Sequence, residues 1–232
     1  MPESQAVQSQ MSSYISKFLK DHFGENPEEM EVQFHPPYLV IHLNGFLLPP
    51  EKMLLDRQEN KRVLESRDLM MNSLKNDFLE GLGSVSDFKG KELFFDWNLE
   101  KQSALLLVIA GNTDAESDFS APHGVLEGPI KDIIEMNSSL TQKKPEKTEL
   151  FWLNSDILLI KRTGILVEIE KQLIKNGAAD ELKLAKRPLE YRITKFFNLD
   201  HFLPSPVEEI FVDWDFHQEY SYIVLLLKRS TP

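Results

Sequence analysis

Arg67 is the residue of this sequence whose type and position best suit the binding of a small anion. It lies on the apolar stripe of a predicted helix, between Val63 and Met70, and a guanidinium buried there must be paired. Arginine can hold carbonate or a carboxylate through two parallel hydrogen bonds. Arg187, in the second half of the chain, is a related candidate one residue out of step. An internal salt bridge is the favoured interpretation of Arg67, and an anion site stays open.

Glu51 and Glu170 are candidates for a catalytic or binding carboxylate. Each stands at the start of a predicted helix, where a carboxylate satisfies free backbone N–H groups and complements the helix dipole. A catalytic base would need a partner acid or a metal, and the sequence shows neither beside these residues. The sequence therefore favours a structural role for both glutamates.

The dipeptides Asp96-Trp97 and Asp213-Trp214 stand at corresponding places in the two halves of the chain. A paired tryptophan and carboxylate can form a surface that binds a protein partner. The same pair can also cover the edge of a core, with the aspartate accepting hydrogen bonds near a hairpin turn. The structural interpretation is favoured, and partner binding stays open.

The sequence predicts no catalytic residues, no metal site and no cofactor. It has no cysteine, and its six histidines are scattered without a metal-ligand spacing. Gly81-Leu82-Gly83 lacks the third glycine of a dinucleotide loop, and it follows a predicted helix instead of a strand. The motifs of phosphate-binding loops and of serine hydrolases are absent from the sequence.

Composition sets the broad class of protein. The chain has 232 residues and a formal net charge of −11, which disfavours nucleic acid as a partner. No apolar stretch approaches the roughly 18 residues of a membrane span, so no direct membrane insertion is expected. The N-terminal residues lack the basic and apolar regions of a signal peptide. We therefore expect a cytoplasmic protein.

An internal repeat organises the chain. The segment Leu39–Leu47 recurs 119 residues later as Leu158–Leu166, and Asp96-Trp97 recurs 117 residues later as Asp213-Trp214. An apolar strand follows the second motif in both halves. The chain is therefore predicted to hold two diverged copies of one module.

Each copy alternates helical and strand periodicity. The predicted order is helix, strand, long helix and hairpin, an α+β module whose antiparallel sheet carries helices on one face. In the first copy the spacing predicts helical structure over residues 51–82. In the second copy Pro188 is expected to break or restart the corresponding helix.

The predicted modules span residues 11–110 and 129–230. Residues 111–128 separate them and begin with small, polar and acidic residues that are typical of a linker. Two fused copies of one module suggest a pseudo-dimer, in which the halves pack as subunits would. A homodimer of the whole chain also stays open.

Residues 11–110 resemble a bacterial family named MpsC-like, after a sodium-translocating system that generates a membrane potential. The motifs that carry the resemblance are Gly24 with Pro27, Gly45–Lys52, Val63-x-x-x-Arg67 and the Asp96 hairpin. Leu48 stands where the family usually has threonine, and the second copy, over Gly164–Glu170, lacks the family's proline. The resemblance implies a small soluble protein associated with membrane components for ion or bicarbonate uptake, and it brings no catalytic residues.

These observations lead to three hypotheses of different classes. The first is a non-enzymatic cytoplasmic accessory protein that binds a protein partner, with a membrane ion or bicarbonate transport subunit as the candidate. The second is a small-anion sensor that uses Arg67 or Arg187. The third is an enzyme in which Glu51 acts as a carboxylate base.

Overall fold

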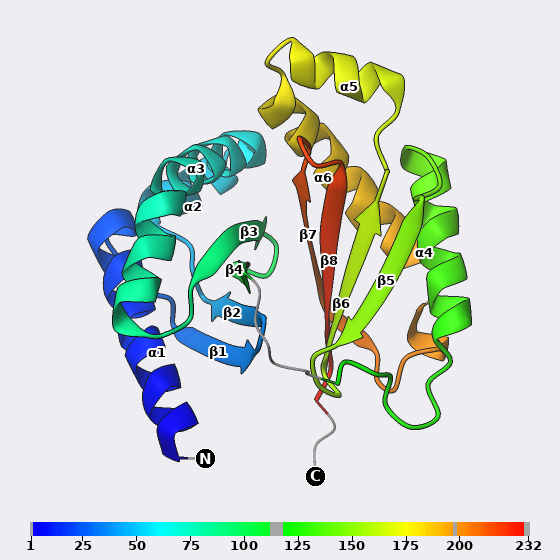
Figure 1. Cartoon of the computed structure of the whole chain (residues 1–232). Helices are drawn as coiled ribbons and strands as arrows, with labels where there is room; N and C mark the ends of the chain where they lie inside the picture. The colour runs from blue at the N-terminus through cyan, green and yellow to red at the C-terminus, as the bar shows by residue number, and fades with distance from the viewer. Residues whose placement is uncertain (1, 112–117, 197–198, 230–232) are drawn as a thin grey trace. The chain divides into compact units, whose positions relative to one another are not determined.

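The chain folds into two compact units in a computed structural model, Met1–Ser117 and Asp118–Pro232 (Figure 1). The structure describes residues 2–111, 118–196 and 199–229, with the side chains of 2–6 and 192–196 left out. Residues 112–117 of the predicted linker lie outside the described part of the chain. The predicted pseudo-dimer concerns the packing of the two units and stays a prediction.

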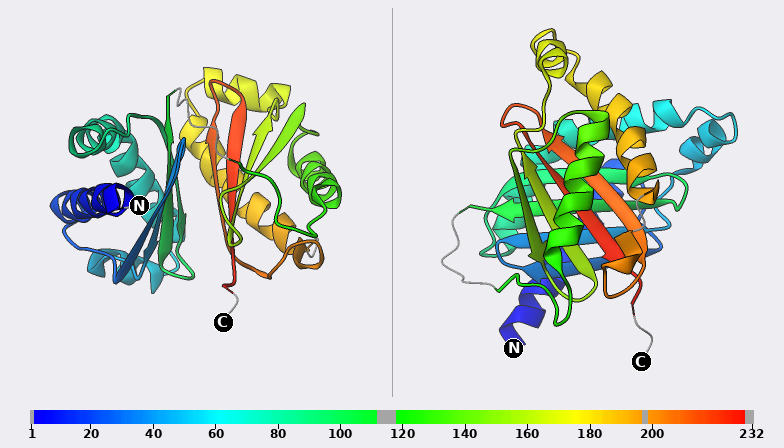
Figure 2. Two further views of the ribbon diagram at one scale, coloured as in Figure 1. Left: turned by 60° about the horizontal axis from the view of Figure 1, so that its bottom comes forward. Right: turned by 90° about the vertical axis from the view of Figure 1, so that its right-hand side faces the viewer.

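Unit 1 consists of three helices and a four-stranded sheet. Its elements are α1 (Pro2–Phe23), β1 (Glu29–His35), β2 (Tyr38–Asn44), α2 (Pro49–Leu55), α3 (Asn60–Val85), β3 (Gly90–Asn98) and β4 (Ser103–Ala110). The long helices α1 and α3 pack against each other and cover one face of the sheet (Figure 2).

Unit 2 repeats this order of elements. They are α4 (Glu127–Thr141), β5 (Lys147–Trp152), β6 (Ile157–Thr163), α5 (Glu168–Lys175), α6 (Ala179–Phe196), a 3-10 turn (Leu199–His201), β7 (Val207–Asp215) and β8 (Tyr220–Leu227). The predicted α+β class and the tandem modules are therefore confirmed. The first strand of each sheet, β1 or β5, is an element that the sequence pattern did not reveal.

The two sheets have the same topology and the same register. Their strand orders are β1-β2-β4-β3 and β5-β6-β8-β7, with antiparallel pairing throughout. Ile41 of β2 lies opposite Leu106 of β4, and the equivalent Ile160 of β6 lies opposite Ile223 of β8. The offsets of 119 and 117 residues found in the sequence thus relate residues at equivalent places in the two sheets.

The buried stripe of the first helix explains how unit 1 forms its core. Met11, Ile15 and Leu19 recur every four residues on α1 and are fully buried. They belong to the same apolar cluster as Ile41 and Leu106 of the sheet. Burial of such a stripe removes apolar surface from water, which is the main favourable contribution to folding.

A glycine in the left-handed conformation ends β2 and its counterpart β6. Gly45 has φ +62°, and Gly164 has φ +68°. A Cβ atom on Gly45 would lie 2.4 Å from the side chain of Glu28, and one on Gly164 would lie 2.4 Å from that of Glu146. Both backbone conformation and space therefore require glycine where the chain turns toward α2 or α5.

The single helical segment predicted over residues 51–82 is wrong. Helix α2 ends at Leu55, and α3 begins at Asn60. Between them Gln58 has φ +61°, and the carbonyl of Leu54 accepts hydrogen bonds from the amides of Arg57 and Glu59. The turn lets α2 and α3 pack against each other, which apolar spacing alone does not disclose.

The predicted break at Pro188 is also wrong, because α6 continues through this residue. Pro188 is exposed, so water can reach the Leu184 carbonyl that the missing N–H leaves without an intrahelical partner. On either side of it, Lys186 and Glu190 are fixed by buried ion pairs. Tertiary contacts thus hold the helix together across the proline.

No helix in the described part of the chain is long and apolar enough to cross a membrane.

Candidate functional site

Glu51 and Arg67 form a buried ion pair that joins the short helix α2 to the long helix α3. Arg67 Nε lies 2.7 Å from Glu51 Oε1, and Arg67 Nη2 lies 2.6 Å from Glu51 Oε2. Glu51 Oε2 also accepts a hydrogen bond of 2.8 Å from the backbone N–H of Leu48. One carboxylate thus caps the N-terminus of α2 and receives two parallel bonds from the guanidinium.

The guanidinium of Arg67 is enclosed by further groups of unit 1. Its Nη2 donates to the carbonyl oxygen of Phe46 at 2.7 Å, and its carbon lies 5.1 Å from the Phe46 ring centre and 4.8 Å from that of Trp97. Arg67 is only 1% exposed. Glu51 therefore occupies the bidentate position that an external anion would take, and Arg67 acts as a structural cation.

Unit 2 builds the same junction with lysine in place of arginine. Glu170 Oε2 accepts a bond of 3.0 Å from the N–H of Val167, and its Oε1 lies 2.6 Å from Lys186 Nζ. Lys186 stands 119 residues after Arg67 and so occupies its position, whereas Arg187 follows it. Lys186 also donates to Gln142, the residue that follows α4, so one ammonium connects the end of α4 with α5 and α6.

Burial lowers the pKa of Lys186, since its charged form loses water. The hydrogen bond and charge of Glu170, with the charge of Glu190, oppose this effect on the pKa, and the charge of Arg162 adds to it. A lysine can give its carboxylate partner only a point charge, whereas Arg67 offers a planar pair of donors. The junction in unit 2 is therefore the weaker of the two.

Both Asp-Trp dipeptides lie on the third strand of their sheets, β3 and β7. Trp97 and Trp214 are buried members of the two cores. Asp96 accepts a bond of 2.9 Å from the backbone N–H of Trp97, and Asp213 accepts one of 2.8 Å from that of Trp214. Lys183 of α6 pairs with Asp213 at 2.8 Å. The tryptophan rings thus face the helices of their own unit.

The environments of the two indole N–H groups differ. Trp97 Nε1 donates to Asp68 Oδ1 at 3.0 Å. Arg187 holds the position of Asp68 in unit 2, so a donor replaces the acceptor. Within the described part of the chain, Trp214 Nε1 is buried without a hydrogen-bond partner.

Four of the buried apolar positions of unit 1 correspond to buried polar residues of unit 2 that hydrogen-bond to one another. They lie on equivalent elements: Leu19, Leu43, Met71 and Ala104 in unit 1, and Ser138, Arg162, Glu190 and Ser221 in unit 2. The first set belongs to the apolar core of unit 1. The second set, which we call the polar quartet, replaces apolar contacts with hydrogen bonds.

The polar quartet is a connected network around Arg162, which is 0% exposed. Arg162 Nη1 and Nη2 donate to the two carboxylate oxygens of Glu190 at 3.1 and 3.0 Å. Its Nε donates to Ser221 at 3.0 Å, and Nη1 also donates to Ser138 at 2.9 Å. Gln142 extends the network by donating to Glu190 at 3.0 Å and accepting from Lys186.

Neither Arg162 nor Glu190 was predicted from the sequence to be a site residue. A signal was present, because Arg162 aligns with Leu43 in the repeated strand, where an arginine interrupts a buried apolar position. The partner could not be recognised, since Glu190 follows 28 residues later on another element. Among the described residues, no three histidine, aspartate or glutamate side chains are grouped so that they could hold a metal ion.

The two units define a class: a tandem pair of α+β modules, each with a buried cation–carboxylate junction. Residues 3–111 match the model of the family described as Na+-translocating membrane potential-generating system (MpsC). The first unit is therefore an MpsC-like module, as its motifs predict, and the match ends before unit 2. No curated protein and no solved structure matches the chain.

Proposed function

We propose that the protein is a non-enzymatic accessory protein of the cytoplasm, which binds a protein partner from a membrane ion or bicarbonate transport system. The observation that carries this proposal is the match of residues 3–111 to the family described above. The buried junctions support it, because Glu51 and Arg67 are engaged with each other and offer no exposed acid–base pair. The third hypothesis, with Glu51 as a catalytic base, has no such support.

The partner is expected to contact unit 1, the part that the family model matches. Among its described residues, this unit exposes two large apolar side chains on its helices, Met53 of α2 (63% exposed) and Leu69 of α3 (70%). Exposed apolar side chains of this kind are candidates for contacts with a protein partner.

The test is affinity purification of the tagged chain from its own cells with solubilised membranes, read by mass spectrometry. We expect enrichment of an ion or bicarbonate transport subunit, and its loss in the variant M53E/L69E. The matched control is L126E, which changes a comparably exposed leucine of unit 2. Recovery of the chain without any transport component would overturn the proposal.

A second candidate, small-anion binding, is favoured by one observation in unit 2. The buried Trp214 Nε1 has no acceptor in the described part of the chain, and the cation Arg187 replaces the acceptor Asp68 of unit 1. An anion could accept from the indole N–H and face the guanidinium. Calorimetry with bicarbonate and simple carboxylates tests this candidate, with R187M as the comparison. The absence of heat at millimolar ligand would rule it out.

A further inference from the structure

Helix α4 buries polar side chains where its counterpart in unit 1 buries apolar ones. The inward residues of α1 are Met11, Ile15, Phe18 and Leu19, and those of α4, 119 residues later, are Ile130, Ile134, Asn137 and Ser138. The spacing of the buried positions is identical in the two helices. The polarity of the second half of the inward face has changed.

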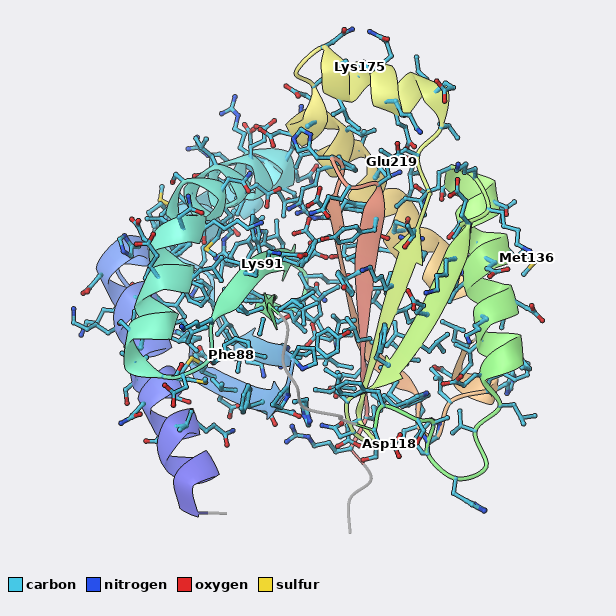
Figure 3. All side chains as sticks on the ribbon, viewed as in Figure 1. Phe88, Lys91, Asp118, Met136, Lys175 and Glu219 are labelled. Carbon is cyan, nitrogen blue, oxygen red and sulfur yellow. The ribbon has the colours of Figure 1, made fainter. Side chains whose placement is uncertain are left out.

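On the outward face of α4, apolar side chains stand where α1 has charged ones. On α1 the exposed residues Lys17 and Asp21 form an ion pair of 2.8 Å. The equivalent residues of α4 are Met136, which is 45% exposed, and Leu140, which is 66% exposed. In Figure 3, Met136 points away from the sheet of unit 2. An exchange of this kind is typical of a helix whose outer face is covered by a partner.

The charges beside these residues indicate which partner fits. All charged residues of α4 lie N-terminal to Met136: Glu127, Lys131, Asp132 and Glu135, with a net charge of −2. The segment after the helix carries Lys143, Lys144, Glu146 and Lys147, with a net charge of +2. An acidic helix followed by a basic segment is self-complementary when two copies of the helix pack antiparallel.

The positions of these residues agree with one two-fold axis. In an antiparallel pair centred at residue 138, Met136 lies level with Leu140 of the second copy, and Asp132 lies toward the end where the second copy's basic segment, with Lys144, follows Thr141. Asp132 and Lys144 are both exposed, and Lys144 pairs with Glu135 of its own chain at 3.0 Å, a surface ion pair that an aspartate of the second copy can extend. The same symmetry operation thus pairs apolar with apolar and brings the acidic helix of one copy to the basic segment of the other, as an isologous interface requires.

We propose that the chain forms a homodimer through the outer face of α4, with Met136 and Leu140 at the centre of the interface. A membrane surface fits this helix less well, because the net charge of α4 is negative and anionic lipids attract basic helices. One helix pair is small beside the interfaces of permanent complexes, so the dimer is expected to dissociate on dilution.

The first experiment measures the mass of the full chain by analytical ultracentrifugation over a range of concentrations. We expect a monomer–dimer equilibrium, and at least a tenfold rise in Kd for the variant M136E/L140E. The matched control is L69E, which adds a charge at a residue of unit 1 that is 70% exposed. A wild-type chain that stays monomeric throughout, or a dimer that M136E/L140E leaves unchanged, would overturn the proposal.

The second experiment tests the antiparallel arrangement by reversing charges. D132K and K144D should each weaken the dimer, and the double variant D132K/K144D should restore it, since the pairs are re-formed across the axis. The chain has no cysteine, so L140C provides a single site for a short thiol cross-linker. Cross-linked dimers from L140C but not from L69C agree with the proposal, whereas equal yields contradict it.

Discussion

Arg162 occupies in unit 2 the position that Leu43 occupies in unit 1. Both residues are fully buried on the second strand of their sheet. Leu43 packs in an apolar core, whereas Arg162 is held by Glu190, Ser138 and Ser221. One fold therefore tolerates a leucine or an arginine at the same core position, provided that the surrounding residues change together.

The variant R162L should destabilise unit 2 by about 3–5 kcal/mol, because it leaves the Glu190 carboxylate buried without its cation. The fourfold change S138L/R162L/E190M/S221A, which copies the residues of unit 1, should recover the stability or exceed it. Urea unfolding followed by hydrogen exchange on peptides of β6 measures both effects separately from unit 1. Equal stability of R162L and the wild-type chain would contradict the importance of the buried network.

The variant R67K should destabilise unit 1 by about 1–3 kcal/mol, because one ammonium cannot replace two parallel donors and the bond to Phe46. The reverse change, K186R, provides the matched comparison in unit 2. Hydrogen exchange in α2 and α5 reports how firmly each short helix is attached. Faster exchange in α2 for R67K, without a change in α5, is the expected outcome.

Stability of unit 2 should rise with pH in the alkaline range below 10.5, the ordinary pKa of lysine. The pKa of Lys186 is lowered in the folded chain by burial, so the unfolded chain binds more protons between the folded and unfolded pKa values. The measurement is the urea midpoint of unit 2, followed by hydrogen exchange, as a function of pH. The difference between the wild-type chain and K186M isolates the contribution of Lys186. A wild-type midpoint that falls relative to K186M in this window would contradict it.

The variant G45A should destabilise unit 1 through two separate causes. Alanine is strained at φ +62°, and its Cβ would collide with Glu28. G24A separates these causes, since Gly24 has φ +85° but nothing within 4 Å of an added Cβ. Urea unfolding should show about 1 kcal/mol of destabilisation for G24A and a larger loss for G45A.

The repeat made much of the fold predictable from the sequence. The tandem modules, the α+β class and the cap formed by Glu51 follow from local patterns that the chain carries twice. The first strands β1 and β5 were not predicted because they are only partly buried, although β1 is as long as β2. The turn between α2 and α3 was not predicted, because glutamine, unlike glycine or asparagine, does not indicate a left-handed backbone conformation.

The partners of the buried charges could not be predicted in the same way. Arg67 pairs with a residue 16 positions earlier, and Arg162 pairs with one 28 positions later. The sequence indicated that Arg67 needs a partner, because a buried charge is costly when alone. It favoured an internal salt bridge over an external anion, but it could not name Glu51 as the partner.

The sequence by itself determined the duplication, the α+β class and most of the apolar faces that form the two cores. Hydrophobic periodicity and glycine positions reflect local backbone preferences, so they can be recognised in the sequence alone. Only the tertiary structure decided that Pro188 stays within a helix and that the polar quartet fills the core of unit 2. The physical reason is that both outcomes depend on contacts between elements far apart in sequence, whose energies exceed the local preferences of the residues involved.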